Sequence, residues 1–128
     1  VAPKNYKPPK VYSLKKITLS KTQKNKASRA LNALRSLESS VSVATYLDFS
    51  RKLVDTKIVV DDSLRSIPKS DLNTEISSSL FAYTQVQARW QQAINTDDND
   101  RSDLDLKLAA DAANAASDHI RNVEKLLK

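Results

Sequence analysis

Residues 71–95 read DLNTEISSSLFAYTQVQARWQQAIN, and this stretch carries the clearest periodic pattern in the chain. Its large apolar side chains recur at intervals of three and four residues: Leu72, Ile76, Leu80, Tyr83, Val86, Trp90 and Ile94. This spacing places them on one face of an α-helix, which repeats about every 3.6 residues. Ser70 stands before the stretch as a candidate N-cap, so the sequence predicts an amphipathic helix over about 71–95.

The segment before this stretch predicts a helix over about 42–66, ended by Pro68. One broad arc of that helix holds Val43, Tyr46, Leu47, Leu53, Val54, Val60 and Leu64. We expect this arc to face the core, because the opposite face carries three aspartates spaced by seven, Asp48, Asp55 and Asp62.

Two more helices complete the pattern. Ser20 and Gln23 form a capping box before a helix over about 21–39, whose expected core residues are Ala27, Ala30, Leu31, Leu34, Leu37 and Val41. A polar, acidic loop at 95–102 precedes a helix over about 103–127, with expected core residues Leu104, Leu108, Ala112, Ala115, Ala116, Val123 and Leu126.

The residues that the chain lacks narrow the fold and the function. Its 128 residues contain no glycine, which disfavours folds with many tight turns and excludes glycine-rich nucleotide loops and nucleophile elbows. They contain no cysteine, which excludes disulfides and thiolate metal sites, and no apolar run long enough to span a membrane. We therefore predict an all-α protein, an up-and-down antiparallel four-helix bundle over residues 20–128 behind an extended basic N-terminal arm over residues 1–19.

Positive charge is concentrated at the start of the chain. The first 37 residues hold ten lysines and arginines and no acid, whereas the rest of the chain has an acidic excess. We expect the arm and the start of the first helix to contact an acidic protein or an anionic surface. The predicted contact residues are Lys4, Tyr6, Lys7, Lys10, Tyr12, Lys15, Lys16, Lys21 and Lys24. The alternatives are a solubilising tail and a strap held against the protein itself.

A buried polar cluster is a second candidate site. His119 falls on the apolar arc of the fourth helix, and Glu38, Lys57 and Asp61 fall on or near the arcs of the first two helices. If these faces meet at one level, they form a carboxylate–histidine cluster that could bind a metal or respond to pH. We favour a hydrogen-bonded core histidine beside interhelical ion pairs, because the Glu-x-x-His pattern of di-iron bundles is absent.

Three other features have structural interpretations beside functional ones. Asp98, Asp100 and Asp103 resemble calcium ligands, but their spacing does not fit an EF-hand, and aspartates are common at helix starts. Trp90 is expected to anchor the core. Phe81 points away from the apolar stripe, which marks it as a candidate interface with the arm or with a second copy in a homodimer.

The function predicted from these patterns is a non-enzymatic interaction or structural domain. No constellation of base, nucleophile and stabilising group is recognisable, and we expect no cofactor. One alternative is a nucleic-acid-binding protein with little sequence preference. Another is a carrier that holds a small ligand or metal in the bundle core, near Tyr46, Tyr83, Trp90 and His119. The start at Val1 without any methionine in the chain favours an exported protein.

Overall fold

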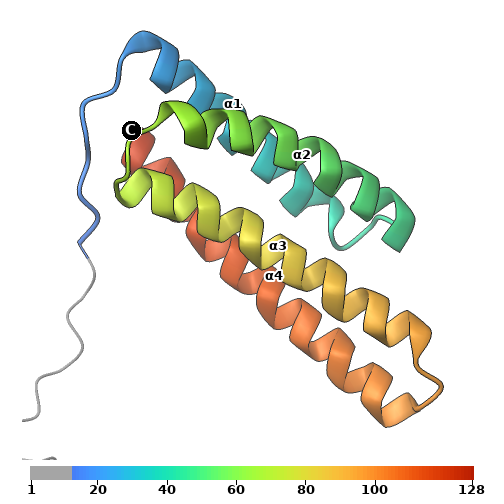
Figure 1. Cartoon of the computed structure of the whole chain (residues 1–128). Coiled ribbons are helices and arrows are strands. Elements are labelled where there is room, and N and C mark those ends of the chain that lie inside the picture. The colour runs from blue at the N-terminus through green and yellow to red at the C-terminus, as the bar shows by residue number, and fades with distance from the viewer. Residues whose placement is uncertain (1–12) are drawn as a thin grey trace, which may run out of the picture.

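The computed structural model describes residues 13–128 and contains four α-helices in this part of the chain. They are α1 (Lys21–Ser40), α2 (Tyr46–Ser66), α3 (Asp71–Asn95) and α4 (Asn99–Leu127). Each helix packs antiparallel to the next, and α1 also contacts α4, as in a four-helix bundle (Figure 1). The prediction of an all-α protein is confirmed.

Side-chain caps decide where the helices begin. The Thr45 hydroxyl accepts the N–H of Asp48 and starts α2 later than the predicted residue 42, because residues 41–44 form a turn. The Asp98 carboxylate accepts the N–H groups of Asp100 and Arg101 and starts α4 four residues earlier than predicted. The Ser20–Gln23 capping box is present at α1, and α3 has the predicted bounds.

The core face of α2 differs from the predicted arc. Phe49, Leu53 and Val60 are buried, whereas Val43, Leu47 and Val54 are exposed. Phe49 turns inward because its ring packs against Tyr83 and Trp90, at centroid distances of 6.3 and 5.6 Å. The small polar residues Thr56 and Ser63 also lie on this buried face. Because they interrupt its apolar residues, the sequence does not show this face as a continuous apolar period.

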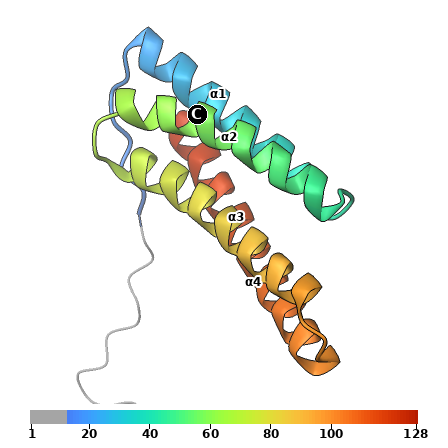
Figure 2. The ribbon, with the colours of Figure 1, turned by 45° about the vertical axis from the view of Figure 1, so that its right-hand side comes forward.

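The helices differ in length, and this difference exposes one end of the second hairpin. α3 and α4 have 25 and 29 residues, against 20 and 21 for α1 and α2. The α3–α4 hairpin therefore extends past the turn between α1 and α2 (Figures 1 and 2). The predicted core residues Ile94 and Leu104 lie in this extension and are exposed, and Trp90 at its base is half-buried. Ala115 is also exposed, contrary to prediction.

No helix within residues 13–128 has the length and apolarity needed to cross a bilayer. The predicted contact residues Lys4, Tyr6, Lys7, Lys10 and Tyr12 lie outside the described residues.

The packing of Phe49 predicts how two substitutions should differ. Phe49→Ala removes a fully buried ring and should lower the free energy of unfolding by about 3–5 kcal/mol. Val43→Ala, at a residue of the same predicted arc that lies in the solvent, should change it by less than about 0.5 kcal/mol. Urea denaturation of both variants measures the difference, and similar losses would contradict the burial of Phe49 in the core.

Candidate functional site

An extended segment holds part of the basic region against one end of the bundle. We call residues 13–20 the strap. Its apolar side chains, Leu14, Ile17 and Leu19, are half-buried against the core, whereas Lys15 and Lys16 are exposed. The backbone N–H of Lys15 donates to the Asp71 carboxylate at 2.7 Å, and the Lys16 ammonium donates to the backbone carbonyl of Lys128 at 3.2 Å. These contacts fix the strap between the start of α3 and the end of α4.

Two shallow hollows lie between the strap and the end of α4, with volumes of about 260 and 160 Å³. They share Lys16 and Leu126 in their walls. Apolar side chains of the strap and α4 contribute to both, and four lysines line them: Lys16, Lys24, Lys125 and Lys128. We call these four residues the lysine cluster. Hollows whose walls hold four ammonium groups among apolar side chains fit a ligand that is negatively charged.

No ammonium group of the lysine cluster forms a salt bridge with a side-chain carboxylate within the described residues, and that of Lys16 donates to the backbone carbonyl of Lys128. Lys26 and Arg35, further along α1, pair with Asp62 and Glu124. The first turn of α1 holds Lys21 and Lys24 and no acid. A helix start carries partial positive charge and is stabilised by acids, so lysines there concentrate positive potential rather than balance it.

The sequence indicated only half of this cluster. Lys16 and Lys24 belong to the basic start of the chain, which was predicted to bind a partner. Lys15 and Lys21 were predicted to contact the same partner and are exposed at the same end of the bundle. Lys125 and Lys128 come from the last turn of α4 and were not predicted, although basic residues at a helix end are common. The antiparallel return of α4 brings them beside the strap (Figure 1).

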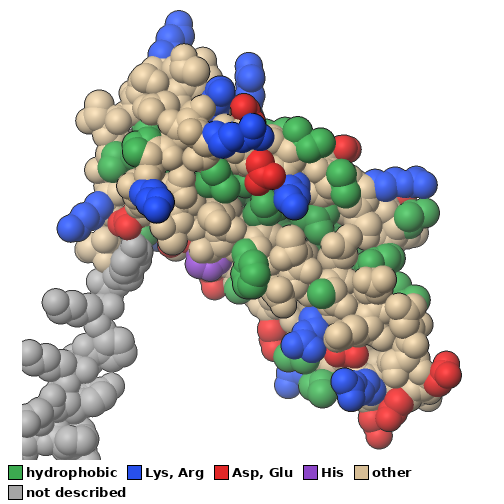
Figure 3. All heavy atoms as spheres, viewed as in Figure 1, with side chains coloured by type: hydrophobic (Ala, Val, Ile, Leu, Met, Phe, Trp, Pro, Cys, Tyr) green, Lys and Arg blue, Asp and Glu red, His purple; other side chains and the backbone are tan. Residues whose placement is uncertain are grey.

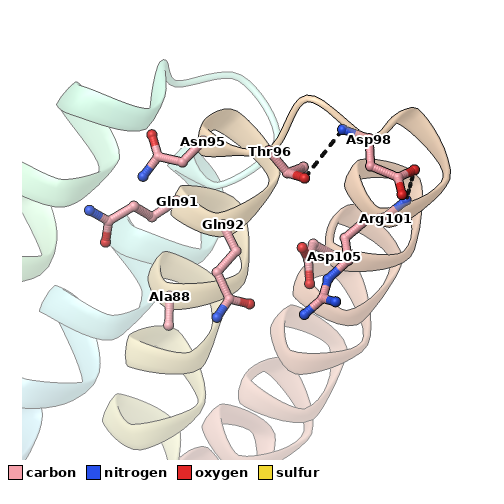
Figure 4. Close-up of a pocket in the computed structure, with 8 residues that line it drawn as sticks. All are labelled: Ala88, Gln91, Gln92, Asn95, Thr96, Asp98, Arg101 and Asp105. Carbon is pink, nitrogen blue, oxygen red and sulfur yellow. Dashed lines mark hydrogen bonds between the residues drawn. The ribbon is translucent and has the colours of Figure 1, made fainter.

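The acidic loop lies at the other end of the molecule, at the tip of the α3–α4 hairpin (Figure 3). An open hollow of about 660 Å³ is found there, lined by amide side chains and by Asp98, Arg101 and Asp105 (Figure 4). Asp98 caps α4, and the buried Asp105 pairs with Arg89 at 3.7 Å. Within residues 13–128 no three His, Cys, Asp or Glu side chains are grouped to hold a metal, so Asp98, Asp100 and Asp103 form no such group.

The predicted polar cluster does not form as proposed. His119 Nδ1 contacts Glu75 Oε2 of α3 at 2.5 Å, and neither Glu38 nor Asp61 is its partner. Lys57 is exposed, because it lies towards the outer side of α2. Glu75 was not among the predicted partners of His119. It is one of the few charged residues of α3, and it is buried. The interhelical pair agrees with the structural interpretation of His119, a hydrogen-bonded histidine between two helices.

The Tyr83 hydroxyl is buried in the core, close to the Ser117 side chain. Burial raises the pKa of Tyr83 well above its ordinary value, and the nearby Glu38 carboxylate raises it further, while the Ser117 side chain acts in the opposite direction. Burial disfavours the charged phenolate of Tyr83, and the Glu38 carboxylate disfavours a second negative charge beside it. Tyr83 therefore stays protonated in the folded protein far into the alkaline range.

Aromatic rings fill part of the core at the level where a carrier would hold its ligand, and a hollow of about 430 Å³ lies beside Trp90, lined also by Val86 and Ala109. The Tyr46 and Trp90 rings meet edge to face at 5.6 Å, and Phe49 packs between Trp90 and Tyr83. Phe81 is exposed on the outer side of α3, as predicted for an interface residue.

Comparison of the chain with protein-family models, with curated proteins and with solved structures found no match.

The raised pKa of Tyr83 predicts an alkaline loss of stability. The folded state holds the phenolic proton more tightly than the unfolded state, so this contribution is complete below about pH 10 and is lost as the pH rises above it. Tyr83→Phe removes the titrating group, so this variant should lose less stability than the parent above pH 10. Thermal melting across this range, with Tyr46→Phe as control, measures the effect. Equal alkaline losses in parent and Tyr83→Phe would contradict it.

The Glu75–His119 contact makes a separate prediction. The Glu75 side chain is only 8% exposed, so His119→Ala leaves a buried carboxyl group without its partner and should cost about 1–3 kcal/mol. Asp118→Ala removes the neighbouring surface pair with Arg121 and should cost less than about 1 kcal/mol. Chemical denaturation of both variants compares the losses, and equal values would mean that the buried contact contributes no more than a surface pair.

Proposed function

We propose that the protein is a non-enzymatic binding domain whose basic end engages an acidic protein or an anionic surface. The observation that carries this proposal is the lysine cluster, four ammonium groups around two hollows with no salt bridge to a side-chain carboxylate in the described residues. The predicted contact residues of the arm would add to the same positive region, because the chain enters the strap at this end of the bundle.

The arrangement of opposite charges supports contact through this end. The exposed acids Asp97, Asp98 and Asp100 lie at the tip of the α3–α4 hairpin, far along the molecule from the strap (Figures 1 and 3). An anionic partner is therefore attracted to one end of the molecule and repelled by the other. The walls of the hollows combine polar and apolar groups, and the ammonium groups among them favour a partner that carries negative charge.

Substitution of three lysines tests this function. Replacing Lys16, Lys24 and Lys125 together by glutamine should raise the dissociation constant for heparin roughly tenfold, because each substitution removes one charge contact of modest strength. The matched control replaces Lys52, Lys57 and Lys107 by glutamine, which changes the net charge equally at other places on the surface. The salt concentration for elution and the apparent affinity for polyglutamate measure the effect.

Equal losses in the two triple variants would contradict the proposal, since retention would then follow net charge alone. Removal of residues 1–12 is the complementary experiment and leaves the strap, with its half-buried Leu14 and Ile17, in place. If this deletion abolishes retention and the triple substitution does not alter it, the arm rather than the lysine cluster is the binding element.

A further inference from the structure

The outer face of α2 carries a regular stripe that the fold does not use. Its residues are spaced alternately by four and three: Leu47, Arg51, Val54, Ile58, Asp61 and Arg65. This is the spacing of a coiled-coil seam, and it lies opposite the buried face formed by Phe49, Leu53 and Val60. We call these six residues the outer stripe.

The apolar members of the outer stripe are unusually accessible. Leu47 is 56% exposed, Val54 59% and Ile58 66%. Single exposed apolar side chains are common on protein surfaces, but these three lie in one line on one helix. Figure 3 shows hydrophobic side chains at the surface along α2 and α3, between charged ones. An ordered apolar line of this kind is typical of a helix that packs against another helix.

The order of residues in the outer stripe is complementary to itself when reversed. If a second α2 lies antiparallel with the two-fold axis near Thr56, Val54 faces Ile58 of the second copy and Arg51 faces Asp61 of the second copy. The symmetry repeats both contacts. The remaining layer places Leu47 against the aliphatic part of Arg65 of the second copy. Each layer therefore joins two apolar groups, two opposite charges, or an apolar group and a long aliphatic stem.

We propose that the protein forms an antiparallel homodimer through the outer stripe of α2, with Arg51–Asp61 ion pairs on both sides of a central Val54–Ile58 contact. This inference goes beyond the proposed function and is independent of it, because the lysine cluster lies outside the outer stripe.

The charged residues of the outer stripe are available for these pairs. The Asp61 carboxylate forms no ion pair within residues 13–128, since Arg65 Nε donates to the backbone carbonyl of Asp61 instead. Arg51 approaches only Asp48 of its own helix, at 4.0 Å, with both side chains largely exposed. Such a contact within one helix is weak, so Arg51 can turn to a carboxylate across an interface at little cost.

Phe81 lies at the level of the proposed two-fold axis. The packing of α2 on α3 brings Tyr46 against Trp90, and the Asn73 amide donates to the Leu64 carbonyl. This antiparallel register places Phe81 level with the middle of α2. Its side chain is 64% exposed on the outer side of α3.

Like charges beside the stripe limit the strength of the dimer. Asp55 and Lys57 flank its centre, and each would approach its own counterpart across the two-fold axis. Repulsion between exposed charges is moderate and screened by salt, so we expect a dimer that dissociates on dilution rather than an obligate one.

Charge exchange between Arg51 and Asp61 tests the inference. Arg51→Asp and Asp61→Arg should each abolish the dimer, because each places like charges opposite one another. An equimolar mixture should associate again, since both cross-pairs then join opposite charges, with a mixed dimer at least about tenfold tighter than either homodimer. Sedimentation equilibrium of the full chain over a range of concentrations measures this, against a monomer mass of 14.3 kDa.

A second pair of variants examines the apolar contact. Ile58→Asp should leave the protein monomeric, whereas Leu104→Asp, a comparable change at an exposed leucine of the α3–α4 tip, should leave dimerisation unchanged. Circular dichroism establishes that each variant folds, and if Ile58→Asp does not fold, the charge-exchange mixture decides alone. The inference is wrong if the parent protein stays monomeric at all concentrations, if the mixture associates no better than its components, or if Leu104→Asp disrupts the dimer equally.

Discussion

Each helix of this protein begins at a side chain that accepts the free N–H groups of the first turn, and the fold depends on these four caps. The caps are Ser20, Thr45, Ser70 and Asp98. A chain without glycine has no easy access to positive φ, and no residue from 13 to 128 adopts it. The connections must therefore be made from extended and right-handed conformations, which favours a few long helices joined by short turns.

Sequence reasoning predicted the elements better than their orientation. α3 was predicted at its observed bounds because its stripe and cap are both local features. The core face of α2 was predicted only in part: Leu53 and Val60 are buried as predicted, whereas Leu47 and Val54 are exposed and Phe49 is buried instead. Contacts with neighbouring helices, such as those of Phe49 with the rings of Tyr83 and Trp90, distinguish the two apolar faces, and a local sequence pattern does not contain them. The lengths of α3 and α4 do not fix how these helices align with α1 and α2. The sequence therefore did not indicate that Ile94 and Leu104 would remain exposed.

The candidate site was predictable to the extent that it is local in sequence. The basic start of the chain pointed to Lys16 and Lys24, but Lys125 and Lys128 join them only through the antiparallel return of α4. The histidine pair shows the same limit. His119 was favoured as a hydrogen-bonded core residue, with Glu38 and Asp61 as the alternative carboxylate partners, and the relative height of the helices pairs it with Glu75 instead. The residue types follow from the sequence, whereas the buried face of α2 and the height of each residue relative to the neighbouring helices depend on the assembled bundle.

The separation of charge along the molecule has a consequence for its rotational motion. Lysines surround the strap at one end and aspartates surround the tip of the α3–α4 hairpin at the other, so the protein has an electric dipole moment along its length. In the field of an anionic surface this moment produces a torque that turns the molecule before contact. The molecule then approaches with its long hairpin directed away from the surface, and a random encounter becomes an oriented one.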